Sequence, residues 1–160
     1  MCLEEDLGVS STEHQNTDDS NFQLLLVEDN DDHAELFRRV LTRLNLPVTL
    51  TRASDGAEAL DYLRERRDQQ ESTTPDMILL DLKLPRMDGH SVLAEIKQDP
   101  NLQRLPVVIL STSNAPSDVR RAYEAQANSY LVKPVDPIQY RDMVRDLVVY
   151  WSTWNESPSL

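Results

Sequence analysis

Short apolar runs alternate with amphipathic stretches along the chain from residue 23 onward. The apolar runs predict five strands, at 23–27, 47–52, 76–81, 106–111 and 129–133. The amphipathic stretches repeat with the period of a helix and predict helices at 31–44, 55–67, 89–98, 117–126 and 136–152. Repeated strand–helix units are typical of an α/β protein with a parallel sheet and right-handed crossovers.

The kind of apolar run in each strand indicates the place of that strand in the sheet. Residues 24–27, 77–80 and 107–110 are apolar throughout, which indicates strands covered by helices on both faces. Residues 48–51 alternate between apolar and polar, which suits an edge strand. We therefore expect a flavodoxin-like fold, with a five-stranded doubly wound parallel sheet in the order 2-1-3-4-5, flanked by five helices.

Two of the predicted helices carry an apolar face that should pack on the sheet. In the first helix the residues of this face are Leu36, Phe37, Val40, Leu41 and Leu44. In the last helix they are Tyr140, Met143, Val144, Leu147, Val148 and Trp151. Both sets repeat with helical spacing, so we expect them to form part of the core.

Composition and charge narrow the class of protein. A chain of 160 residues, 39% hydrophobic and 28% charged, suits one domain, which we place at 22–152. No apolar run approaches the roughly 20 residues that span a bilayer, and no signal peptide is expected, so we predict no membrane partner. A net charge of −12 argues against a nucleic acid partner. The lone cysteine, Cys2, can form no internal disulfide and favours a cytoplasmic location.

Much of the negative charge lies in the first 21 residues, which contain six acidic residues and no lysine or arginine. Few apolar residues accompany these acids, so we expect 1–21 to be a disordered acidic tail. A short C-terminal tail, 153–160, follows the last predicted helix.

Charged side chains stand at the carboxyl ends of three predicted strands. Glu28 and Asp29 close the first strand, Asp81 closes the third, and Lys133 closes the fifth. In the expected strand order the first and third strands are neighbours, and the ligand crevice of such sheets lies at this edge. We therefore expect these side chains to converge in one pocket, with Ser111 from the end of the fourth strand beside them.

The charges of this pocket favour a magnesium ion. Three carboxylates and one ammonium leave a net charge of −2, and like charges about 4 Å apart repel by roughly 4 kcal/mol at an effective dielectric constant near 20. Mg²⁺ supplies the missing charge and prefers oxygen ligands. A zinc site is not expected, because the histidines, His14, His33 and His90, are scattered along the chain.

A carboxylate beside Mg²⁺ and a lysine can attack a phosphoryl donor, and a serine hydroxyl can donate to the phosphoryl oxygens. Each residue alone also has an ordinary structural interpretation, since strand-end Asp, Ser and Lys-Pro are common in caps and turns. Their coincidence at the ends of four strands favours a functional pocket.

The motifs that carry these residues, taken together, resemble the receiver domain of two-component response regulators. They are 26–30 (LVEDN), 81–89 (DLKLPRMDG), 108–111 (VILS) and 129–134 (SYLVKP). The resemblance covers 23–152 and is specific as a set, whereas each motif alone is weak. It implies a stand-alone signalling protein that catalyses only its own phosphorylation and dephosphorylation, and is not otherwise an enzyme.

The resemblance implies a role for each residue of the pocket. Asp81 would be the phosphoacceptor and a Mg²⁺ ligand, and Asp29 would bind Mg²⁺ directly. Glu28, where many members have Asp, would act through water. The backbone carbonyl of Lys83 would be a further Mg²⁺ ligand, and Lys133 would bind the phosphoryl group.

Ser111 and Tyr130 would form the switch that responds to phosphorylation. Ser111 stands where Thr is commoner in the family, and it keeps the hydroxyl that is drawn to the phosphoryl group. Tyr130 occupies the aromatic position whose ring then turns inward; an ordinary half-buried strand residue is the alternative. The peptide bond before Pro134 is expected to be cis, as in the family.

A narrower resemblance points to the single-domain regulators paired with bacterial and cyanobacterial phytochromes. It rests on 111–113, 127–130 and 150–151. It implies a sensor histidine kinase that is a red-light photoreceptor, and a homodimer formed through 117–126, 129–133 and 136–152. Phosphorylation would signal by changing this surface.

Other functions stay open at this point. A phosphatase of the haloacid-dehalogenase type also uses a strand-end Asp and Mg²⁺, but it carries a second acid two residues later, on the first strand. Here Asp81 lies on the third predicted strand and is followed by Leu82 and Lys83. A receiver can also serve as a phosphorelay intermediate or a phosphate sink. The intact Asp81, Asp29 and Lys133 argue against a pseudo-receiver that is never phosphorylated.

Overall fold

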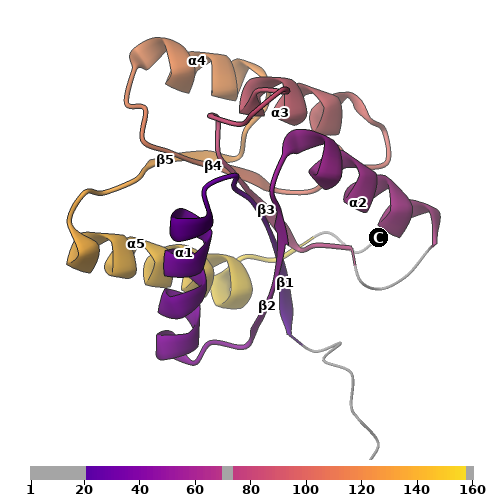
Figure 1. Cartoon of the computed structure of the whole chain (residues 1–160). Coiled ribbons are helices and arrows are strands. Elements are labelled where there is room, and N and C mark those ends of the chain that lie inside the picture. Colours follow the sequence, from indigo (N-terminus) through magenta and orange to yellow (C-terminus); the bar gives the residue numbers. More distant parts are fainter. Residues whose placement is uncertain (1–20, 70–73, 158–160) are drawn as a thin grey trace, which may run out of the picture.

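The protein folds as a central sheet between two layers of helices, as Figure 1 shows. This computed structural model describes residues 21–69 and 74–157. The strands are β1 (Phe22–Val27), β2 (Val48–Ala53), β3 (Met77–Leu80), β4 (Val107–Ser111) and β5 (Ser129–Val132). The helices are α1 (Asp31–Leu44), α2 (Gly56–Asp68), α3 (Gly89–Gln98), α4 (Pro116–Glu124), α5 (Pro137–Val149) and the π-helical turn η1 (Tyr150–Trp154).

The strands are parallel and lie in the order β2-β1-β3-β4-β5, which confirms the predicted fold. Val27 pairs with Leu80 at the carboxyl ends of β1 and β3, and Ser111 pairs with Val132 at those of β4 and β5. The residues that follow these strands therefore emerge together at one edge of the sheet.

Two helix layers explain why the central strands are apolar on both faces. Figure 1 shows α1 and α5 on one face of the sheet and α2, α3 and α4 on the other. Leu24 and Leu26 of β1 pack in the core beneath α1 and α5, whereas Leu25 and Val27 pack beneath the other three helices. On β2, by contrast, every residue except Ala53 is only half-buried, as expected for the predicted edge strand.

The apolar face of α1 differs from the prediction at one position. Phe37, Val40 and Leu41 are buried as expected, but the fourth buried residue is Ala34, and Leu36 is 42% exposed. Successive residues of a helix lie about 100° apart, so Leu36 falls beside the stripe centred on Phe37. Leu36, in the N-terminal half of α1, is therefore exposed to solvent.

The last helix ends differently from the prediction of a regular helix over 136–152. The α-helix stops at Val149, and the chain continues through η1 to Trp154, where the N–H of Asn155 donates to the Tyr150 carbonyl at 2.8 Å. Trp151 packs against the core beneath α1 and α5, whereas Trp154 is 73% exposed.

Helix caps attach α1, α3 and α5 to the carboxyl edge of the sheet. Asn30 accepts the N–H groups of Asp32 and His33, and Asp88 and Asp136 cap α3 and α5 in the same way. At the start of α3, a Cβ on Gly89 would lie 2.2 Å from the carbonyl oxygen of Asp81. Glycine is needed there because no other residue lets the helix approach the strand end so closely.

Most of the predicted tails fall outside the described residues, which exclude 1–20 and 158–160. Among the helices of the described part, none combines the length and apolar character that crossing a membrane requires.

Candidate functional site

A buried ammonium stands at the centre of the carboxyl edge. The Lys133 side chain is 7% exposed, and its Nζ donates to Glu28 Oε2 at 2.6 Å and to Asp81 Oδ2 at 3.0 Å. It also lies 3.2 Å from Nδ1 of His33. The structure thus brings together an acid from β1, an acid from β3 and a lysine from β5, at the edge where the sequence places them.

Backbone N–H groups hold the two carboxylates from the other side. Glu28 Oε1 accepts the N–H of Asn30 at 3.2 Å, and Asp81 Oδ1 accepts the N–H of Lys83 at 3.0 Å. Burial raises the pKa of Glu28, and the Asp81 charge adds to the rise; the hydrogen bond from Lys133 opposes it but does not cancel it. The Glu28 carboxylate is therefore held ionised at a cost.

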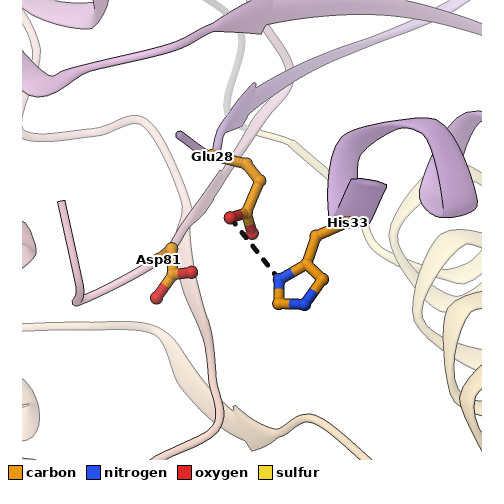
Figure 2. A group of neighbouring side chains, drawn as sticks. All are labelled: Glu28, His33 and Asp81. Atoms are coloured by element: carbon orange, nitrogen blue, oxygen red, sulfur yellow. Dashed lines mark ion pairs between the residues drawn. The ribbon is translucent and has the colours of Figure 1, made fainter. Parts of the chain in front are cut away.

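His33 is the pocket residue that the sequence did not predict. Figure 2 shows its ring facing Glu28, with Nδ1 3.7 Å from Glu28 Oε1. One ligand atom each from Glu28, His33 and Asp81 lie within 4.8 Å of one another. A signal exists in the sequence, because His33 lies four residues before Phe37 and hence on the same face of α1.

Asp29 does not join this cluster. It is exposed, although its carbonyl oxygen and that of Glu28 accept hydrogen bonds from the Arg52 guanidinium at 3.2 and 3.0 Å. The same guanidinium pairs with Asp31 at 2.8 Å. Arg52 thus fixes the main chain of the acidic loop from the edge strand, a role that the sequence analysis did not foresee.

Ser111 lies at the same edge and is fully buried. Its carbonyl accepts the N–H of Lys133 at 2.8 Å, and its hydroxyl accepts the N–H of Ser113 at 3.2 Å. The peptide bond between Lys133 and Pro134 is trans, so the predicted cis bond is wrong; trans is also the ordinary preference of such bonds.

Ser113 connects the pocket to α4 and β5. Its hydroxyl donates a hydrogen bond to Asp118 in the first turn of α4, and its carbonyl accepts the hydroxyl of Tyr130 at 2.8 Å. The hydrogen bond from Ser113 lowers the pKa of Asp118, and His90 contributes to this shift. His90 is buried on α3, with Nε2 3.5 Å from Asp118 Oδ1.

The pocket fits a cation, because one is already held there. The Lys133 ammonium acts as a stand-in ion between two buried carboxylates, and those carboxylates supply the oxygen atoms that Mg²⁺ and Mn²⁺ prefer. Lys83, by contrast, exposes its side chain, and only its backbone N–H contacts Asp81.

Replacing Glu28 by Gln tests the electrostatic cost of the pocket. A carboxyl group whose pKa in the folded state is raised above the ordinary 4.5 stabilises the fold fully below pH 4.5. This stabilisation is lost as the pH rises through the raised pKa. Glu28→Gln cannot lose stability in this way. We therefore compare the free energy of unfolding of Glu28→Gln with that of the wild type in metal-free buffer. The difference, variant minus wild type, should increase as the pH rises from about 4.5 through the raised pKa of Glu28, and should then level off.

Denaturant titrations at about pH 4 to 8 measure this difference. A difference that stays constant or decreases with pH would contradict the assignment of a raised pKa to Glu28.

Comparison with known proteins identifies the family of the chain. The response regulator receiver domain matches residues 24–145. The chain is 45% identical over 137 residues to the methanogenesis regulatory protein FilR2 of Methanothrix harundinacea, covering 86% of this chain and 88% of FilR2. It is 40% identical over 128 residues to the response regulator Rcp1 of Synechocystis, covering 80% of this chain and 87% of Rcp1.

Solved structures give the same result. The phosphorylated cyanobacterial phytochrome response regulator RcpA has a TM-score of 0.79 at 38% identity, covering 87% of this chain and 99% of RcpA. The Mn²⁺-bound form of Rcp1 has a TM-score of 0.77 at 38% identity, covering 86% of this chain and 99% of that structure. Sequence, fold and the grouping of acids around one lysine therefore lead to one conclusion: the chain belongs to the response regulator receiver domain family.

Proposed function

We propose that this protein is a stand-alone response regulator that accepts a phosphoryl group on Asp81 from a histidine kinase, in a Mg²⁺-dependent reaction. The observation that carries the proposal is the Lys133 ammonium, which lies 3.0 Å from the Asp81 carboxylate in a pocket shared with Glu28. As a family, receiver domains are signalling modules that receive phosphoryl groups from sensor histidine kinases.

In the proposed transfer, an Asp81 carboxylate oxygen bonds to phosphorus while the bond from phosphorus to the kinase histidine nitrogen breaks. The nitrogen keeps the electron pair and takes up a proton. Hydrogen bonds from the Lys83 N–H and from Lys133 hold the two carboxylate oxygens in one orientation before the donor arrives. The Lys133 ammonium then offsets negative charge on the transferred group.

Magnesium, when bound, neutralises charge on the phosphoryl oxygens and the acidic side chains. We assign its ligands to Asp81, Asp29 and the carbonyl of Lys83, with Glu28 acting through water. The Asp29 carboxylate lies outside the cluster, and Arg52 holds its backbone carbonyl, so the assignment requires Asp29 to turn toward the pocket when the ion binds. The acidic pocket of the family binds Mg²⁺ or Mn²⁺.

The signal would leave the pocket through Ser111. A phosphoryl oxygen is a stronger hydrogen-bond acceptor than an uncharged one, so it would draw the Ser111 hydroxyl toward Asp81. That hydroxyl holds the N–H of Ser113, whose other atoms hold Tyr130 and Asp118. Movement of Ser111 would therefore reach β5 and α4, which together with α5 form the proposed output surface.

We place the kinase partner among phytochrome-type receptors and the reaction in the cytoplasm. The support is the similarity to RcpA and Rcp1, whereas FilR2 is connected with a different process, methanogenesis. A hollow of 360 Å³ beside Lys133 offers an apolar contact for a kinase, since Leu36 and Val135 on its rim are exposed. Release of phosphate from Asp81 without an output would instead make the protein a phosphate sink.

A homodimer through α4, β5 and α5 is the assembly that the exposed apolar residues favour. Tyr123 on α4, Val132 on β5 and Tyr150 after α5 are 50%, 42% and 53% exposed. A groove of 770 Å³ between β5 and α5 adds Met143 and Trp151 to this surface. Aromatic residues of this kind carry much of the binding energy at interfaces.

Phosphotransfer from an autophosphorylated bacteriophytochrome kinase tests the proposed reaction. In Mg²⁺ the wild-type protein should take the label, and Asp81→Asn should take none, because it lacks the attacking carboxylate. Chelation of Mg²⁺ should stop transfer to wild type. Asp88→Asn is the matched control, since Asp88 lies in the same turn and caps α3, a role that Asn also fills.

Labelling of Asp81→Asn at the wild-type rate would place the acceptor elsewhere. Transfer from unrelated kinases but not from phytochrome kinases would reject the pairing while leaving Asp81 as acceptor. Steady release of phosphate from a small phosphate ester would favour the phosphatase.

Light scattering tests the proposed dimer with two variants of equal exposure. Val132 on β5 and Leu36 on α1 are both 42% exposed. Val132→Asp should give a monomer, because it buries a charge in the proposed interface, whereas Leu36→Asp should leave the dimer intact. A wild-type monomer at high concentration, with and without the phosphoryl group, would reject the dimer.

A further inference from the structure

The imidazole ring of His33 lies against the Lys133 ammonium. An ammonium group only donates hydrogen bonds, and Nδ1 of His33 lies 3.2 Å from Lys133 Nζ. The same Nδ1 lies 3.7 Å from Glu28 Oε1. Figure 2 shows the other ring nitrogen turned away from the carboxylates.

Three groups place possible ligand atoms around the position of the Lys133 ammonium. Glu28 and Asp81 contribute carboxylate oxygens, and His33 contributes an imidazole nitrogen, with these ligand atoms within 4.8 Å of one another. The two acids are 2% and 7% exposed, whereas the His33 side chain is 43% exposed, so the position is buried on the side of the acids and open on the side of the histidine. A divalent ion would neutralise both carboxylates and would displace the Lys133 ammonium.

The nitrogen atom distinguishes this pocket from one built of oxygen alone. Mg²⁺ is bound through oxygen ligands, whereas imidazole suits the later divalent transition metals. We infer that His33 is a metal ligand of this pocket, and that it shifts selectivity from Mg²⁺ toward transition cations such as Co²⁺. The inference rests on the proposed Mg²⁺ site, with which it shares Asp81. A transition cation would take Glu28 and His33 as its other direct ligands, whereas Mg²⁺ would take Asp29 and the carbonyl of Lys83.

The same geometry links cation binding to the proposed phosphorylation. Lys133 Nζ and a bound cation would share the same three partners, so they exclude each other at this position. Binding of the cation would free the ammonium to meet the phosphoryl group on Asp81. His33 therefore holds Lys133 before the cation binds and holds the cation afterwards.

Titration of the full chain with Co²⁺ tests the inference without any phosphoryl donor. The protein carries Cys2→Ser and His14→Ala, so that other thiol and imidazole groups of the first twenty residues cannot bind the metal. Calorimetry gives the affinity, and visible absorption of Co²⁺ reports nitrogen ligation. The same titration with Mg²⁺ gives the reference, and excess Mg²⁺ is then used to displace Co²⁺.

Two variants separate a ligand from a hydrogen-bond partner. His33→Ala removes both roles, and His33→Asn keeps an oxygen acceptor for Lys133 but loses the imidazole. Both should weaken Co²⁺ binding by at least about 10-fold to 100-fold, the range found when an outer-shell partner of a metal ligand is lost. Mg²⁺ binding should change by less than about twofold, since its ligands are oxygen atoms.

Equal Co²⁺ affinity in wild type and both variants would overturn the inference, as would Co²⁺ that Mg²⁺ cannot displace. If Asp81 is still labelled in a Mg²⁺-dependent reaction when Co²⁺ binding gives either of these results, the proposed function stands and only the role of His33 as a metal ligand is rejected. Far-ultraviolet circular dichroism of each variant checks that it folds. His33→Ala should fold, because residue 33 lies in α1 and Ala has a high helix propensity.

Discussion

The ammonium of Lys133 is the interaction on which the rest of the structure depends. It joins the ends of β1, β3 and β5 by lying within 3.0 Å of two carboxylates that are almost fully buried. Two like charges at about 4 Å repel by roughly 4 kcal/mol at an effective dielectric constant near 20. Removing one partner of a buried ionic group costs on the order of 3–5 kcal/mol. Lys133 therefore offsets the repulsion between the two buried acids at the ends of β1 and β3.

This arrangement leaves the pocket poised for a change of partners. Burial still raises the pKa of Glu28 despite Lys133, so the ammonium alone does not offset the burial of the Glu28 carboxylate. A divalent cation or a phosphoryl group would change the charge around the two acids and so the position of the Lys133 ammonium. Ser111 would respond to this change, because its carbonyl accepts the Lys133 N–H. Ser113 then extends the hydrogen bonds to Tyr130 and Asp118. Stability and signalling thus use the same few contacts.

The sequence predicts the parts of this pocket that depend on strand order. Continuous apolar runs identify the central strands, and neighbouring strands 1 and 3 bring Glu28 and Asp81 together across a long separation. It does not predict the orientation of Asp29, although successive residues of an extended chain point to opposite sides. Glu28 and Asp29 therefore face apart, with Glu28 buried and Asp29 exposed.

His33 and Leu36 depend on the rotation of α1 about its axis, which the apolar pattern defines only loosely. The Asn30 cap sets where the helix begins, and this places His33 on the side of the pocket and Leu36 beside the buried stripe. Read within a run of charged residues, His33 has the pattern of a solvent-exposed position. The spacing of His33 from Phe37 indicates the side of α1 on which it lies, but only the packing of that helix against the sheet shows that Glu28 and Lys133 are its neighbours.

A crystal structure with Mg²⁺ and beryllofluoride, which mimics a phosphoryl group on a carboxylate, tests the central claim most directly. The account predicts beryllium bonded to an Asp81 oxygen, with Lys133 Nζ moved from Glu28 to the fluorine atoms. Beryllofluoride on another acidic residue, or a Lys133 ammonium that still bridges Glu28 and Asp81, would contradict it.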